Sequence, residues 1–241
     1  MPDLKPLNFP KSLLLFGIPS VFFILIAYGV IPFLNTGLGL HPAFSWFIGG
    51  LIVFVPLFIL AIALARSDGY KTKKDLFERL RLRKLSGRDW KYVVVSSLII
   101  FTATGAIMGV SKLLNLKFGI PEIETTPAFM KFETLTGNQR YLLLIWIVMF
   151  FFNMYGEELL WRGYILPRQE LRFKENAWIL NAVLWMLFHL SFGIQLMIML
   201  VPIMIVLPYA VQKTQNTNVG LLIHALLNGP MFILVSLGVV V

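Results

Sequence analysis

Long apolar runs separated by short polar segments dominate the chain. They lie at residues 13–34, 44–65, 91–114, 141–161, 177–192, 194–211 and 219–241. Most are close to the ~20 residues that an α-helix needs to cross a bilayer. Alternation with a period of two, the pattern of a membrane β-barrel, is not seen. The pattern therefore predicts an all-α fold, a polytopic transmembrane helix bundle of about seven helices, with six or eight as the alternatives.

Composition agrees with this prediction. The chain has 241 residues, of which 58% are hydrophobic and only 14% charged, with a mean hydropathy of +0.79. Soluble domains are about 25% charged. We find no internal repeat and expect one membrane-embedded domain over residues 1–241. The first apolar run is too long for the hydrophobic region of a signal peptide, so we expect a retained helix.

The positive charges predict the orientation. Residues 66–90 carry nine Lys and Arg residues, whereas residues 35–43 carry none. Because Lys and Arg concentrate in cytoplasmic loops, the N-terminus and loop 66–90 should be cytoplasmic in a bacterial-type plasma membrane. The net charge of +9 then reflects topology and contact with anionic lipid, and we expect no nucleic-acid partner. Residues 66–90 should include an amphipathic helix on the membrane surface.

Few residues in the apolar runs can perform chemistry. The absence of cysteine excludes disulfides, thiolate catalysis and cysteine-based metal sites. Glu157 and Glu158 are the only carboxylates inside an apolar run, and a charge at bilayer depth costs on the order of 2.5–3.5 kcal/mol on insertion scales. His189 and His224 also lie in apolar runs, whereas His41 lies in a loop and should be inert. Ionisable groups inside a membrane usually mark a functional site.

Spacing shows which of these groups share a helical face. Four pairs are separated by four positions: Asn153 with Glu157, Glu158 with Arg162, Trp185 with His189, and His224 with Asn228. A rise of about 1.5 Å per residue places one layer of polar groups on the cytoplasmic side of the bilayer centre. This depth favours a peptide that enters from the cytoplasm or laterally from the bilayer.

These residue types together suggest hydrolysis. A carboxylate helped by a histidine can deprotonate a bound water. A second histidine and an asparagine amide can donate hydrogen bonds to the oxyanion that forms when water attacks a carbonyl. Glu158 precedes Arg162 by four positions, which is the favourable order for an ion pair within a helix. This pair could have a structural role and hold two helices together, with no part in hydrolysis.

Three ordered motifs resemble the signature of the CAAX-protease and bacteriocin-processing (CPBP, or abortive-infection) family of intramembrane glutamic endopeptidases. Glu157-Glu158-Leu-Leu-Trp-Arg162 resembles the family's Glu-Glu-x-x-x-Arg. Trp185-Met-Leu-Phe-His189 matches Phe-x-x-x-His except for its first residue, which keeps an aromatic ring. His224-Ala-Leu-Leu-Asn228 matches His-x-x-x-Asn.

The resemblance implies a peptidase similar to CAAX prenyl proteases, with its catalytic half at about 141–230 and its site between the fourth, fifth and seventh helices. Carried over by motif position, Glu157 would activate water with help from His189, and His224 and Asn228 would stabilise the oxyanion. Glu158 and Arg162 would organise the site. The implied partners are the lipid bilayer and a peptide or membrane-protein substrate, with or without an attached lipid. No metal cofactor is implied, and a zinc site at Glu157, His189 and His224 is the alternative.

Two further interpretations remain open. The chain could be a noncatalytic membrane partner or immunity protein of the same fold, although such a protein has no need of the base. It could be a small proton-coupled carrier, in which Glu157 and His189 would relay protons. Gly105 and Gly109 hint at a helix-packing face inside the monomer.

Overall fold

The computed structural model describes residues 4–238, without the side chain of Met231, and this part of the chain is helical with no strand. Its α-helices are α1 (Phe9–Leu25), α2 (Pro42–Ser67), α3 (Lys73–Arg79), α4 (Gly87–Phe118), α5 (Leu142–Glu157), α6 (Leu166–Phe173), α7 (Ala177–Phe188), α8 (Gly193–Thr214) and α9 (Thr217–Ser236). The seven expected spans correspond to α1, α2, α4, α5, α7, α8 and α9. This confirms a polytopic helix bundle.

Within the described residues, six helical stretches are long and apolar enough to cross a membrane. The number is six because residues 137–188 form one nearly continuous stretch that contains both α5 and the shorter α7. The first span continues beyond α1 through two π-helical turns, Ile26–Val30 and Phe33–Gly37.

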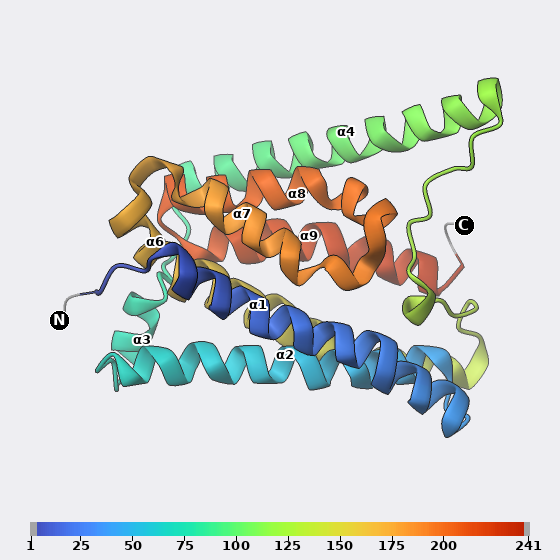
Figure 1. Ribbon diagram of the computed structural model, residues 1–241, viewed down its shortest axis with the longest axis horizontal. Coiled ribbons are helices and arrows are strands. Elements are labelled where there is room, and N and C mark those ends of the chain that lie inside the picture. The colour runs from blue at the N-terminus through green and yellow to red at the C-terminus, as the bar shows by residue number, and fades with distance from the viewer. Residues whose placement is uncertain (1–3, 239–241) are drawn as a thin grey trace.

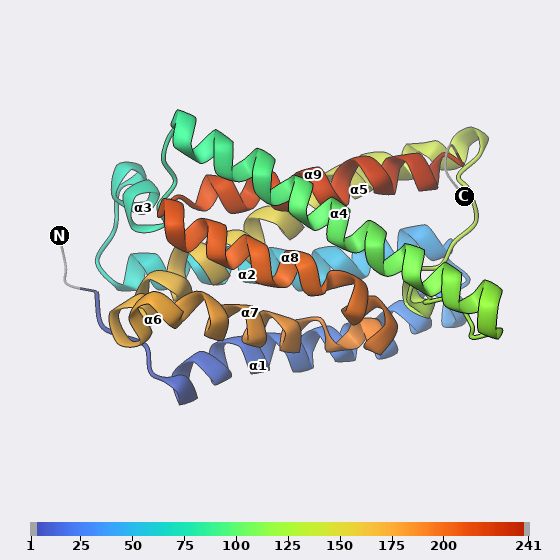
Figure 2. The same ribbon diagram turned by 90° about the horizontal axis from the view of Figure 1, so that it is seen from above.

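The long helices lie side by side along one direction (Figures 1 and 2). α2 packs along α5, α7 contacts both α1 and α8, and α4 covers α8 and α9. The contact between α2 and α5 is especially close at Gly156, where an added Cβ would lie 2.7 Å from the Phe54 carbonyl oxygen. Only glycine lets the two backbones approach to this distance, and this contact fixes the C-terminal part of α5 against α2.

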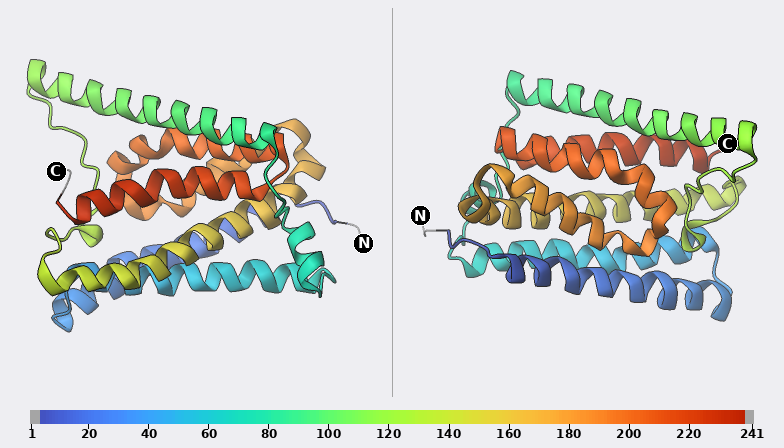
Figure 3. Two further views of the ribbon diagram at one scale, coloured as in Figure 1. Left: turned by 180° about the vertical axis from the view of Figure 1, so that it is seen from behind. Right: turned by 45° about the horizontal axis from the view of Figure 1, so that its top comes forward.

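The two ends of the bundle differ (Figures 1 and 3). One end carries the N-terminus, α3 and α6, and we call it the basic end for its many Lys and Arg residues. The other end carries the long connection between α4 and α5, residues 119–141, and the described C-terminus. We call it the loop end. The second half of α4 diverges from the bundle there, and an added Cβ at Gly105 or Gly109 would meet nothing within 4 Å. The packing face expected at these glycines is therefore not formed by the described residues.

The segment after α2 forms a short helix, α3, at the basic end. α3 packs against the bundle there, with Arg79 and Leu80 buried. The Arg79 guanidinium donates from Nη1 to the Gly163 carbonyl at 3.1 Å and from Nη2 to the Tyr164 carbonyl at 3.3 Å. Burial lowers the pKa of Arg79 from its ordinary value. These contacts join α3 to another helix, which the local pattern cannot show, and the position of α3 on the membrane surface stays a prediction.

Candidate active site

The two adjacent glutamates lie where the fifth helix changes its geometry. Glu157 ends α5, and Glu158 begins a π-helical segment, Glu158–Ile165, whose residues are all buried. The Asn181 amide donates to the Trp161 carbonyl at 3.1 Å, so a neighbouring helix binds a carbonyl of the widened turn. π-helical insertions of this kind occur frequently at functional sites.

The Glu157 carboxylate is held by one donor from its own helix and one from α7. Asn153 donates from Nδ2 to Oε1 at 2.9 Å, as their spacing predicted. The Trp185 indole donates from Nε1 to Oε2 at 2.6 Å. The side chain of Glu157 is 1% exposed, so both oxygens are fixed in an almost dry setting.

His189 lies beside this carboxylate. Its Nδ1 is 3.0 Å from the Trp185 carbonyl oxygen, which can only accept, so Nδ1 carries a proton. In the neutral ring, Nε2 is then the acceptor. Nε2 lies 3.9 Å from Glu157 Oε2, close enough for one water molecule to contact both atoms.

Glu158 has a different set of partners. Its Oε1 is 3.0 Å from His224 Nδ1 and 3.3 Å from Arg162 Nη1, and all three side chains are buried. The Arg162 guanidinium also lies over the Trp185 ring, 3.6 Å from its centroid. Trp185 therefore contacts both layers of the site: its indole N–H binds Glu157 and its ring face binds Arg162.

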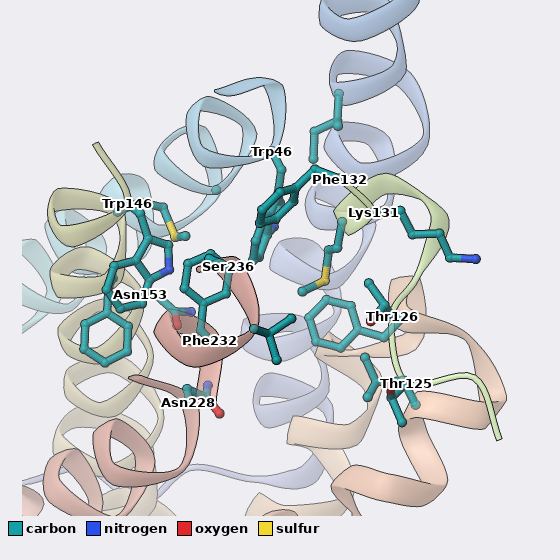
Figure 4. A pocket seen from close by; sticks show the side chains of 18 of the residues that line it. Trp46, Thr125, Thr126, Lys131, Phe132, Trp146, Asn153, Asn228, Phe232 and Ser236 are labelled. Atoms are coloured by element: carbon teal, nitrogen blue, oxygen red, sulfur yellow. The ribbon is translucent and has the colours of Figure 1, made fainter. Parts of the chain in front are cut away.

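A cavity of about 1270 Å³ extends from this group toward the loop end, and its lining includes Glu157, His189, His224 and Asn228. Asn228 is exposed on α9 and lies at the cavity with Asn153 and Phe232 (Figure 4). Glu158 and Arg162 do not line the cavity and lie buried behind it. The structure thus brings together four expected site residues around one space, between α5, α7 and α9.

One protein family matches a part of this chain that contains the site. Residues 139–229 match the family described as "Type II CAAX prenyl endopeptidase Rce1-like". This part of the chain, somewhat more than a third of its length, is similar to the Rce1-like family. The match supports an intramembrane protease of the CAAX type in general. The match includes all six expected site residues and leaves out α1 to α4. No match is found among curated proteins or among solved structures.

Two contacts of the Rce1-like site were missed by sequence reasoning. The bond from the Trp185 indole to Glu157 joins α7 to α5, and no spacing within one helix reveals it. The second is the fit of Gly220 against Glu158, where an added Cβ would lie 2.5 Å from Oε2. The replacement of phenylalanine by tryptophan at position 185 was the available signal for the first contact, because it adds a hydrogen-bond donor.

A metal ion at the Rce1-like site would need several His, Asp or Glu side chains as ligands. Within the described residues, no group of three or more His, Asp or Glu side chains is arranged to hold a metal ion. His224 Nδ1 faces Glu158, and both oxygens of Glu157 already accept hydrogen bonds from neutral donors. Glu157, His189 and His224 are therefore not grouped as metal ligands in the described residues, and the choice between a metal-free and a zinc mechanism stays a prediction.

Proposed function

We propose that this Rce1-like protein is an intramembrane glutamic endopeptidase, with Glu157 as the base that activates water. One observation carries the proposal: a buried carboxylate, fixed by two neutral donors, lies beside an unpaired histidine nitrogen in the wall of a large cavity. This arrangement suits proton abstraction from water in a place with little bulk solvent.

The water-activating pair is Glu157 and His189. A water between Oε2 of Glu157 and Nε2 of His189 meets two acceptors, so both of its protons can be bound while a lone pair points to the substrate carbonyl. Glu157 takes the proton as the water oxygen attacks the carbonyl carbon. It then gives the proton to the amide nitrogen when the C–N bond breaks, so that the amine leaves and the new carboxyl group remains on the other product. The donors on Glu157 keep the carboxylate oriented before and after this transfer.

The oxyanion donors are His224 and Asn228. Because Nδ1 of His224 faces the Glu158 carboxylate at 3.0 Å, the opposite nitrogen, Nε2, is the one available to the cavity. When Nε2 carries a proton, it can donate to the oxyanion while Glu158 holds the ring through Nδ1. The Asn228 amide, one turn further along α9, supplies a neutral donor.

The substrate class follows from the cavity. Aromatic and aliphatic side chains form most of its lining, among them Phe54, Trp146, Phe192 and Leu200. Such walls suit the apolar side chains of a peptide or membrane-protein segment, and equally an attached lipid such as the prenyl group of a CAAX sequence. Peptide processing linked to bacteriocins or abortive infection would use the same chemistry.

The test is cleavage of farnesylated and unmodified peptides by purified protein, with products read by mass spectrometry. Glu157→Gln should lower the cleavage rate by roughly 10²–10⁴-fold, because it removes the base and keeps the shape. Glu78→Gln, the same change at an exposed position of α3, should cleave like the wild type. Unchanged cleavage by Glu157→Gln would remove Glu157 from the role of base. Cleavage that stops with a chelator would favour zinc instead.

A further inference from the structure

The charges are divided unequally between the two ends of the bundle. Of the 21 Lys and Arg residues, only four lie at the loop end: Lys112, Lys117, Lys131 and Arg140. The other seventeen lie at the basic end or in the helix turns next to it. By the positive-inside rule, the basic end faces the cytoplasm and the loop end faces the opposite side.

The cavity opens toward the loop end. The long helices line it mainly with residues toward that end: residues 23–31 of the first span, 42–54 of α2, 146–157 of α5, 196–204 of α8 and 224–236 of α9. The connection between α4 and α5 supplies polar lining residues at the mouth, among them Thr125, Thr126 and Lys131 (Figure 4). With about 1.5 Å per residue, Glu157 lies roughly 22 Å along α5 from its first residue at this end.

The basic end is closed behind the site. Leu160, Trp161 and Arg162 are each 0% exposed. Below them, an added Cβ at Gly163 would lie 3.0 Å from the Leu80 carbonyl oxygen, and Thr217 donates to that same carbonyl at 2.7 Å. Among the described residues, none that lines the cavity comes from α3, α6 or the loops at the basic end. A chain in the cytoplasm therefore has no direct path to Glu157.

We propose that the substrates of this site are apolar peptide segments presented from the non-cytoplasmic side of the membrane. The outward end of a membrane protein, or an exported polypeptide still held in the bilayer, has this chemistry. A lipid-modified tail in the cytoplasm does not reach the mouth. The inference rests on the proposed function, and it replaces the expected cytoplasmic entry, because that expectation used the depth of the polar layer without knowing which end was closed.

The absence of native cysteine allows a direct test by single-cysteine labelling in a bacterial host. Thr126→Cys and Asn138→Cys place an exposed thiol at the loop end, and Lys74→Cys places one at the basic end. A membrane-impermeant maleimide added to intact spheroplasts should label the first two. It should label Lys74→Cys only after the membrane is permeabilised. Labelling of Lys74→Cys in intact spheroplasts, alone or with the others, would overturn the proposal.

The side of cleavage is tested with two reporters that carry the same apolar peptide at the outer or at the cytoplasmic end of a single transmembrane helix. Wild-type protein should cut only the outer reporter, and Glu157→Gln should cut neither. Cleavage of the cytoplasmic reporter, or of neither when the purified enzyme cuts the free peptide in detergent, would overturn the proposal. If no peptide is cut in detergent, where both ends are open, the proposed function fails while the labelling still decides the orientation.

Discussion

Glu157 and Glu158 are adjacent in sequence, but packing gives them different surroundings. Glu157 faces the cavity and accepts hydrogen bonds from neutral donors, whereas Glu158 lies behind it between Arg162 and His224. Glu158 lies 3.3 Å from Arg162 Nη1 and 3.0 Å from His224 Nδ1, so it connects these two side chains and holds the His224 ring in place. In the proposed mechanism the first residue reacts and the second orients His224.

The Trp185 indole should contribute to catalysis through Glu157. Trp185→Phe removes the donor at 2.6 Å and keeps an aromatic ring over Arg162. Because a hydrogen bond to a charged group contributes about 1.5–3 kcal/mol, kcat should fall by roughly 10–100-fold. KM should change little. Steady-state kinetics on one peptide gives kcat and KM separately for this variant and for the control Trp178→Phe, at the other end of α7. A loss of equal size in Trp178→Phe would show a general packing effect.

Asn228 should act on the transition state. Asn228→Ala should lower kcat by roughly 10²–10³-fold if the amide donates to the oxyanion. The comparison is Asn138→Ala, an exposed asparagine at the loop end. An increase of KM with kcat unchanged would place Asn228 in substrate binding instead.

The residue-scale prediction from sequence succeeded where a contact lies within one helix. Spacing alone identified Asn153 with Glu157 and Glu158 with Arg162, and both contacts are present. The bond between Glu158 and His224 was not predicted, since 66 positions separate the two residues. Contacts of that kind depend on how α9 packs against the π-helical segment, which one sequence does not contain. The catalytic roles of Glu157, His189, His224 and Asn228 stay predictions.

At the scale of the elements, the site depends on a close approach of α9 to the π-helical segment. Gly220 permits this approach, because an added Cβ would lie 2.5 Å from Glu158 Oε2 and 2.8 Å from Val211 Cγ2. The widened turn itself was not expected from the sequence. Helix type here follows from tertiary contacts, since Asn181 binds a carbonyl of the widened turn.

Gly220→Ala should therefore damage the site without removing any functional group. The added methyl displaces Glu158, so we expect lower activity and a free energy of unfolding reduced by about 1–3 kcal/mol, the usual cost of overpacking. Gly105→Ala is the matched control, with open space around its Cβ. Thermal unfolding in detergent and the cleavage rate are both measured. A neutral Gly220→Ala would contradict the close fit.

At the scale of the whole molecule, the chain forms a bundle with a cavity open at one end and a closed basic end. Apolar runs and charge bias were enough to predict the helices. They did not predict that the basic end is closed. The closure depends on contacts between Arg79 of α3 and the carbonyls of Gly163 and Tyr164 in the π-helical segment, which are far apart in sequence.

The Arg79 contacts that close the basic end should contribute to stability. Arg79→Ala leaves the carbonyls of Gly163 and Tyr164 without their guanidinium donor, and should lower the free energy of unfolding by about 1.5–3 kcal/mol. Lys74→Ala, an exposed position on the same helix, should have almost no effect. The midpoint of thermal unfolding in detergent checks the pair. Equal midpoints for both variants would show that the Arg79 contacts contribute nothing.

In the proposed mechanism Glu157 activates water and does not itself attack the peptide. Cleavage in ¹⁸O-labelled water, with chelator present, tests it most directly, because mass spectrometry can read both the product and the enzyme peptide that contains Glu157. We expect ¹⁸O in the new carboxylate of the product and none in the side chain of Glu157. Label in Glu157 would instead indicate a covalent acyl intermediate, and loss of cleavage with the chelator would indicate a metal. Either result would rule out Glu157 as the metal-free base that activates water.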